Sequence, residues 1–198
     1  MTPPVERGSR ADGRVLAAAG VCVVASCAVL LLRNAPLATS VRTPAGLALA
    51  YAVVLAASAA IAHSVSGPPG DVPRTGVAVA APLGVGLLAL VLARVAVAPT
   101  ASVGATAESA ALSVLAAVAE EALFRGAAFR LLQRGGTWTA VLGSAGLFAL
   151  VHVPAYGWPV VPVDFGAGLL FSWQRLASGR WSVPAATHAA ANLLAVMR

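Results

Sequence analysis

Residues 15–32 read VLAAAGVCVVASCAVLLL, an uninterrupted run of 18 residues without a charge. A helix of about 20 apolar residues is long enough to cross the hydrocarbon core of a bilayer. Comparable runs follow at 45–62 and 76–98, with a loop rich in glycine and proline at 64–75 between them. This pattern predicts a membrane protein that crosses the bilayer several times.

A cleaved signal peptide is the alternative interpretation of the first run, because residues 35–38 (APLA) resemble a cleavage site. The apolar region of a signal peptide usually has about 7–15 residues. The run at 15–32 is longer than that, so we favour a membrane helix that is retained in the mature protein.

The composition of the whole chain points to the same fold class. Apolar residues make up 59% of the 198 residues, charged residues make up 10%, and the mean hydropathy is +0.86. Soluble domains average roughly 45–50% apolar and about 25% charged residues. The composition therefore excludes a soluble enzyme and a disordered chain, and it predicts an all-α bundle of membrane helices.

The second half of the chain continues the pattern in shorter runs. We expect helices at 102–134, 138–153, 160–176 and 181–197, with turns between helices at Gly135–Gly136 and at 178–180. The chain then divides into a polar N-terminal tail at 1–14, about three membrane helices within 15–100, and a helical core at 102–198. In total the sequence predicts about seven transmembrane helices.

Arginine supplies all of the basic charge, because the 13 basic residues include no lysine, and the net charge is +6. With the N-terminus in the cytoplasm, eight arginines fall on the inner side: Arg7, Arg10, Arg14, Arg74, Arg130, Arg134, Arg175 and Arg180. The outer side receives Arg33, Arg42 and Arg198. The positive-inside rule therefore favours a cytoplasmic N-terminus. The arginines form no basic stripe interleaved with aromatic residues, so we expect no nucleic-acid partner.

One motif places charges in the middle of a predicted membrane helix, where they are costly and point to function. It reads Glu120-Glu121-Ala-Leu-Phe-Arg125. Glu121 and Arg125 are four residues apart and can form an ion pair on one helix face. Glu120 projects about 100° away from Glu121. One carboxylate is therefore expected to be structural, and the other is left for chemistry.

Two further motifs each add a histidine on a later helix: Phe148-x-x-x-His152 and His188-x-x-x-Asn192. Glu120 lies 15 residues before Gly135, and His152 lies 16 residues after Gly136. Antiparallel helices that rise ~1.5 Å per residue would bring both side chains to about 23 Å from this turn. We therefore expect the carboxylate and the imidazole to meet in a cavity that contains little water, with the third motif at a similar depth.

Such a cavity contains the groups that hydrolysis needs without a covalent nucleophile. A carboxylate beside an imidazole can deprotonate a water, and a second imidazole with an amide can stabilise an oxyanion. Three alternatives stay open: a zinc-dependent protease with Glu120, His152 and His188 as ligands, a small transporter or proton relay, and a non-catalytic immunity protein. No His-x-x-x-His spacing is present, so we favour a site without metal or other cofactor.

In this order on late membrane helices, the three motifs resemble those of the CAAX protease and bacteriocin-processing family, also called CPBP or Abi. Its members are intramembrane endopeptidases related to the type II CAAX prenyl endopeptidase, and the resemblance covers about residues 105–197. It implies that Glu120 activates the water with His152 as its partner, and that His188 and Asn192 form the oxyanion hole. The supporting residues that it implies are Glu121, Arg125 and Phe148.

The resemblance also implies where the protein acts and on what. We expect an integral protein of a bacterial plasma membrane whose substrate is a protein or peptide, either soluble or membrane-associated. A chain of this type need not cleave prenylated proteins. Family members commonly have more membrane spans and longer loops than this chain, and residues 1–100 match no motif of the family.

Overall fold

The computed structural model describes residues 6–34, 43–65, 74–96 and 106–196, and all regular elements within these ranges are helical. The α-helices are α1 (Glu6–Asn34), α2 (Pro44–Ser64), α3 (Val77–Ala96), α4 (Ala107–Glu121), α5 (Phe129–Leu132), α6 (Thr137–Tyr156), α7 (Val161–Ser178) and α8 (Ser182–Val196). A π-helix, Ala122–Ala128, connects α4 to α5, so these three elements form one continuous segment. The described residues thus contain seven helical segments, in the order that the sequence predicts.

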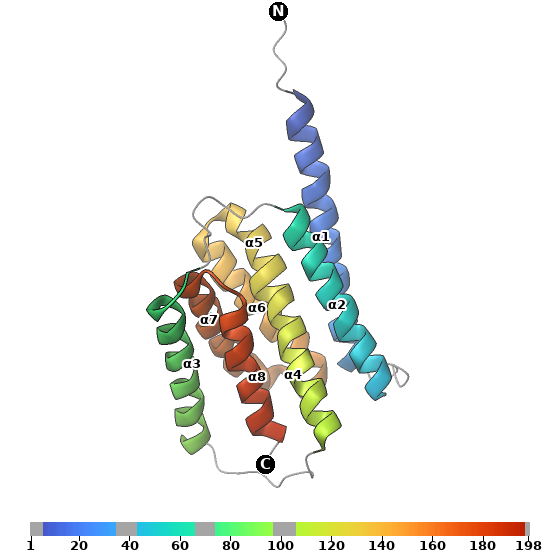
Figure 1. Ribbon diagram of the computed structural model, residues 1–198. Coiled ribbons are helices and arrows are strands. Elements are labelled where there is room, and N and C mark those ends of the chain that lie inside the picture. The colour runs from blue at the N-terminus through green and yellow to red at the C-terminus, as the bar shows by residue number, and fades with distance from the viewer. Residues whose placement is uncertain (1–5, 35–42, 66–73, 97–105, 197–198) are drawn as a thin grey trace, which may run out of the picture.

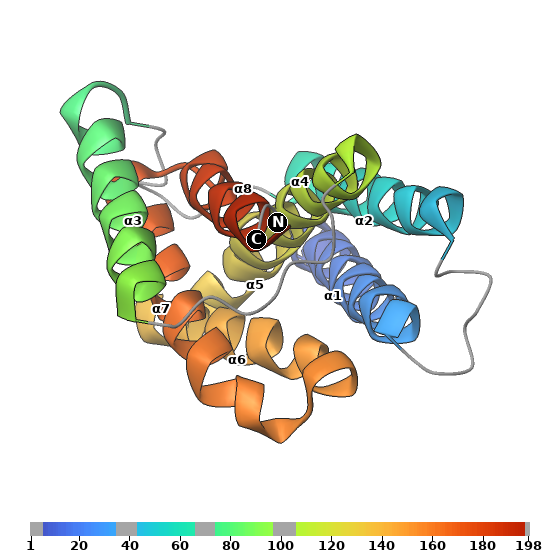
Figure 2. The same ribbon diagram turned by 90° about the horizontal axis from the view of Figure 1, so that it is seen from below.

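The segments alternate in direction along the bundle (Figure 1). Helix α6 packs along α7, and α4 packs along α8. The pair α1–α2 covers one side of these four helices, and α3 covers the opposite side by contacting α7 and α8 (Figure 2). Helix α1 begins at one end of the bundle and α8 finishes at the other (Figure 1). This arrangement is the one expected of an odd number of membrane crossings.

Two described helices, α2 and α6, are long and apolar enough to cross a membrane, and shorter apolar stretches lie in α1 (Val15–Leu31) and α3 (Val77–Ala93). Helices α1 to α3 also expose large apolar side chains, including Val24, Leu49 and Leu88. Apolar surface that extends over several helices marks a region that contacts lipid or protein. The all-helical fold class is confirmed, and the number of helices that cross the membrane stays a prediction.

Three helix ends differ from the predicted ones by more than two residues. Helix α4 begins at Ala107, because the hydroxyl of Thr106 caps it by accepting from the backbone N–H of Ser109, and the prediction placed its start at 102. Helix α6 continues through Pro154 and ends at Tyr156, and the next residue is Gly157, whose φ of +76° favours glycine. A proline removes one backbone hydrogen bond and crowds the preceding turn, and α6 nevertheless continues for two residues beyond Pro154. Helix α1 begins at Glu6, so residues 6–14 of the predicted polar tail are helical. This stretch contains Glu, Arg and Ala, which are good helix formers and extend the apolar helix.

Arginine side chains bind the ends of two helices at the end of the bundle where α1 begins. Arg130 donates hydrogen bonds to the carbonyl oxygens of Ala62 (3.0 Å) and Val65 (3.1 Å) at the end of α2. Arg74 donates to the carbonyl oxygen of Ala177 (3.0 Å) in the last turn of α7. The last carbonyls of a helix lack partners within the helix, so these arginines stabilise both helix ends.

Candidate active site

Glu120 lies at the centre of a buried polar cluster. Its side chain extends from the last turn of α4, and the residue is 2% exposed. Its Oε2 atom lies 3.6 Å from Nε2 of His152 on α6 and 4.0 Å from Nε2 of His188 on α8. Three helices therefore bring one carboxylate and two imidazoles together. Glu120 and His152 meet as their equal distances from the Gly135–Gly136 turn predict.

Both histidines are held through Nδ1. In His152 this atom lies 2.8 Å from the carbonyl oxygen of Phe148, one turn earlier on α6. In His188 it lies 3.1 Å from Oε1 of Glu121. Carbonyl oxygens and ionised carboxylates only accept hydrogen bonds, so we assign the proton to Nδ1 in each neutral ring. The unprotonated Nε2 atoms are then the ones directed towards Glu120.

Glu121 and Arg125 form the ion pair that their spacing predicts. The NH1 group of Arg125 donates to Oε1 of Glu121 at 2.9 Å, and both side chains are 0% exposed. The NH2 group of Arg125 donates to the carbonyl oxygen of Gly168 on α7 at 3.0 Å. A Cβ atom at Gly168 would lie 2.8 Å from Cα of Ala145, so a glycine is needed for this close approach of α7 to α6. The packing of α7 on α6 thereby positions the carbonyl that binds Arg125.

The π-helix carries Arg125 and makes backbone groups available to neighbouring helices. The carbonyl oxygen of Phe124 accepts a hydrogen bond from Oγ of Ser144 on α6 at 2.9 Å. The carbonyl oxygen of Arg125 accepts one from Nε of Arg175 on α7 at 3.1 Å. π-Helical turns are rare and are frequent at functional sites. Here the π-helix fastens the segment that carries the two carboxylates to α6 and α7.

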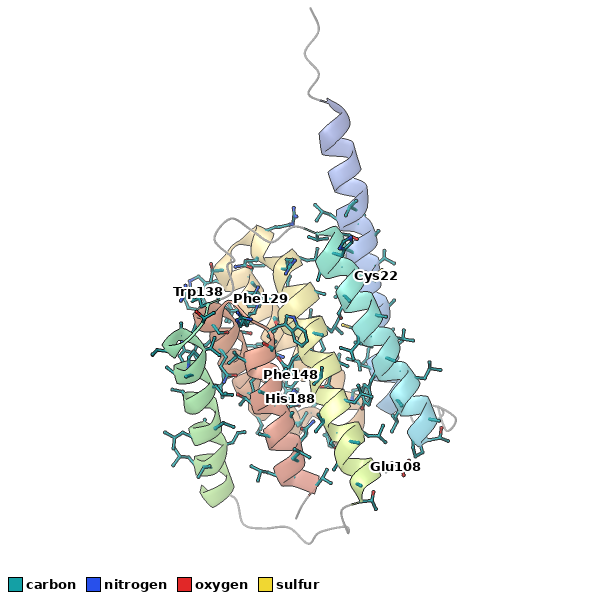
Figure 3. The ribbon with its side chains drawn as sticks, viewed as in Figure 1. Cys22, Glu108, Phe129, Trp138, Phe148 and His188 are labelled. Atoms are coloured by element: carbon teal, nitrogen blue, oxygen red, sulfur yellow. The ribbon has the colours of Figure 1, made fainter. Side chains whose placement is uncertain are left out.

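The ring of Phe148 packs against several side chains of the cluster. Its ring centroid lies 4.8 Å from that of His152 and 5.4 Å from that of His188, with both pairs in edge-to-face geometry. The Cζ atom of Arg125 lies 4.7 Å from the same centroid, within the range of a cation–π contact. Figure 3 shows Phe148 and His188 next to each other inside the bundle. Phe148 therefore contacts both histidines and the guanidinium of the ion pair.

The cluster lines a cavity of about 500 Å³ enclosed by α2, α4, α6 and α8. Its polar lining includes Glu120, both histidines and Asn192, and its apolar lining includes Leu47 and Leu112. The Nδ2 atom of Asn192 donates to the carbonyl oxygen of Ser113 at 3.1 Å, which fixes the amide between α8 and α4. The lining runs along α4 from Ser109 in its first turn to Glu120 in its last turn. At the lower end it also includes Leu47 near the start of α2 and Val196 at the end of α8. The cavity thus extends towards the lower end of the bundle in Figure 1.

Two contacts of the cluster were not predicted from the sequence motifs. Asp164, for which the sequence suggests a helix start or a cavity-lining residue without a partner, lies in the first turn of α7. Its Oδ2 atom is 3.4 Å from Nδ1 of His152. The bond between Glu121 and His188 is also absent from the motif-based prediction. Both contacts depend on how the helices are rotated about their axes, and the motif spacings carry no signal for that rotation.

The zinc alternative can be compared with the geometry of the same three side chains. Zinc–nitrogen and zinc–oxygen bonds of about 2.0–2.1 Å place tetrahedral ligand atoms roughly 3.3 Å apart. The two distances from Oε2 of Glu120 to the histidines are wider, at 3.6 and 4.0 Å. Within the described ranges, no group of three or more His, Cys, Asp or Glu residues is arranged to hold a metal ion.

Residues 102–194 match the family model of the type II CAAX prenyl endopeptidase Rce1-like proteins. The matched range contains all three motifs and leaves α1, α2 and α3 outside. Comparisons with curated proteins and with solved structures gave no match. The resemblance seen in the motifs is therefore confirmed for the C-terminal part of the chain.

Proposed function

Because residues 102–194 form a domain of the Rce1-like family of membrane-embedded CAAX-type proteases, we propose that this chain is an intramembrane endopeptidase with a glutamate-activated water. One observation supports this proposal most directly. Oε2 of Glu120 faces Nε2 of His152 and of His188 within a cavity, at 3.6 and 4.0 Å. Polar atoms at such separations are commonly bridged by a water.

In the proposed reaction, the water between these groups attacks the carbonyl carbon of the scissile peptide bond. Glu120 takes one proton from the water as the carbon–oxygen bond forms. The proton then passes through Nε2 of His152 to the nitrogen of the leaving amine as the carbon–nitrogen bond breaks. The first products are a carboxylic acid and an amine, and Glu120 is again ionised. The acid passes its remaining proton to the amine, so that the products leave as a carboxylate and an ammonium ion.

The oxyanion of the tetrahedral intermediate would be stabilised by His188 and Asn192. Because Nδ1 of His188 is bonded to Glu121, Nε2 can donate to an oxyanion only when this ring is doubly protonated. One N–H of the Asn192 amide binds Ser113, and the other is available for the oxyanion. Prepositioned donors of this kind lower the barrier because they need no reorganisation during the reaction.

The substrate in this proposal is an unfolded protein or peptide segment that enters from the lower end of the bundle. The opposite end holds Arg74 and Arg130 together with most of the other arginines. Of the arginines expected on the outer side, Arg33 falls at the lower end of α1, and Arg42 and Arg198 lie outside the described residues. The positive-inside rule therefore supports a cavity mouth on the non-cytoplasmic side of a bacterial plasma membrane.

The proposal is tested by comparing the N-termini of all membrane proteins and secreted peptides between cells that carry different variants. Wild type and Glu120→Ala form the main comparison, and Glu108→Ala is the control because Glu108 is an exposed carboxylate on the same helix. We expect new N-termini in the wild type and the control that are missing in Glu120→Ala. Identical N-termini in all three strains would count against the proteolytic function.

A further inference from the structure

Asp164 directs a carboxylate oxygen at the side of His152 that faces away from Glu120. Oδ2 of Asp164 lies 3.4 Å from Nδ1 of His152, and the Asp164 side chain is 19% exposed. This oxygen is buried from solvent and makes no hydrogen bond to any described residue. An acceptor that is buried without a hydrogen bond is costly. Its position beside the ring therefore calls for a reason.

Asp164 is not needed to fix the tautomer of His152, because the carbonyl oxygen of Phe148 already accepts a hydrogen bond from Nδ1–H at 2.8 Å. Asp164 adds a negative charge, which a backbone carbonyl lacks. In the proposed reaction Nε2 of His152 takes up a proton and then releases it to the leaving amine. During that step the ring is a cation, with Glu120 on one side and Asp164 on the other.

We infer that Asp164 is a positioning residue that stabilises the protonated ring of His152 during proton transfer to the leaving amine. This inference rests on the proposed protease function. A carboxylate behind a catalytic histidine has this role in serine proteases, where it holds the ring and stabilises the imidazolium without taking the proton itself. In this chain the carboxylate comes from α7, outside the three motifs.

A purely structural role for Asp164 makes a different prediction. A carboxylate in the first turn of a helix interacts favourably with the helix dipole. Glu108 also lies in the first turn of its helix, α4, and is exposed. If Asp164 acted only on the helix, Asp164→Asn and Glu108→Gln would have similar small effects on thermal stability, and turnover would not change.

The test uses the full-length protein in detergent, with a fluorogenic peptide that spans a cleavage site found in the N-terminal comparison. We expect Asp164→Asn to lower kcat about 10- to 100-fold with little change in KM, as the loss of an orienting carboxylate does elsewhere. Asp164→Glu should recover a large part of that loss. The Tm of Asp164→Asn should stay close to that of Glu108→Gln.

A second measurement does not depend on the substrate. The chain has three histidines, so protein labelled with ¹⁵N-histidine gives few ring signals, and single histidine variants assign them. The ring signals of His152 should shift in Asp164→Asn, and those of His63 should stay in place. An unchanged kcat in Asp164→Asn, or a loss of kcat that merely follows a loss of Tm, would overturn the inference. If Glu120→Gln also keeps full turnover, the protease proposal itself fails.

Discussion

Oε1 of Glu121 accepts a hydrogen bond from Nδ1 of His188, a residue 67 positions further along the chain, at 3.1 Å. The same oxygen is bound by Arg125 at 2.9 Å. Glu121 therefore joins a fixed buried cation to a ring that lines the cavity. The motif alone marks Glu121 as one partner of an ion pair. In the structure Glu121 also orients His188, the proposed oxyanion donor.

Replacement of Glu121 by Gln should lower both the yield of folded protein and the activity. The change leaves Arg125 without its charge partner in a site that is shielded from water, and breaking a buried ion pair costs about 3–5 kcal/mol. Thermal unfolding in detergent measures the effect, with Glu108→Gln as the control for loss of a carboxylate on α4. A Glu121→Gln protein that is fully stable but inactive would assign the base to Glu121.

Replacement of Glu120 by Gln should leave the fold intact and remove the base. The amide keeps the size and hydrogen-bonding capacity of the carboxylate, and loss of a general base lowers turnover at least ~100-fold. Turnover of the fluorogenic peptide by Glu120→Gln and Glu108→Gln, purified side by side, gives the measurement. Near-normal turnover by Glu120→Gln would contradict its proposed role.

Replacement of Asn192 by Ala should reduce kcat by roughly 100- to 1000-fold and leave KM nearly unchanged, because an oxyanion donor acts mainly in the transition state. Ser113→Ala is the matched control. Ser113 lines the same cavity, and it is its backbone carbonyl that binds Asn192. A rise in KM without a fall in kcat would instead identify Asn192 as a substrate-binding residue.

Strong chelators should leave the peptidase activity largely intact if the site works without a metal. The measurement combines activity after chelation with the metal content of the purified protein. Stoichiometric zinc that disappears in His152→Ala would support the zinc-dependent alternative, in which Glu120, His152 and His188 are the ligands.

The course of the helices could be predicted from the sequence, because apolar runs and glycine-rich breaks determine where each helix begins and ends. The meeting of Glu120 with His152 followed from the same information, since equal helix lengths from one turn give equal depth. The helix end beyond Pro154 was predicted wrongly, because a proline can kink a helix without ending it.

Contacts that depend on helix rotation could not be predicted in this way. The approach of Asp164 to His152 and the bond between Arg175 and the carbonyl of Arg125 require the packing of α7 against α6 and the π-helix. The close packing at Gly168 is one determinant of that rotation. No single-chain pattern of apolar residues specifies a π-helical turn, so the bonds that its carbonyls accept from Ser144 and Arg175 had no signature in the sequence.

Cysteines introduced at the two ends of the bundle should differ in their accessibility. Figure 3 shows Glu108 at the lower end of α4 and Trp138 near the opposite end, and both side chains are exposed. After Cys22 and Cys27 are replaced by Ala, a membrane-impermeant maleimide should label Glu108→Cys in intact cells. It should label Trp138→Cys only after the membrane is permeabilised. The reverse pattern would place the cavity mouth and the C-terminus in the cytoplasm.

The π-helix also affects how chains of this kind can diverge. Deletion of one residue from the last three positions of the π-helix, 126–128, would let a regular α-helix form while every motif residue and its spacing remained in the sequence. The residues that follow would turn by about 100° around the helix axis. The packing of these residues against α6 would then change, and with it the bond from Ser144 to the carbonyl of Phe124. A chain that has every motif residue can thus lack a working site. The number of residues between Glu121 and Phe129 distinguishes a chain with the π-helix from one with a regular α-helix.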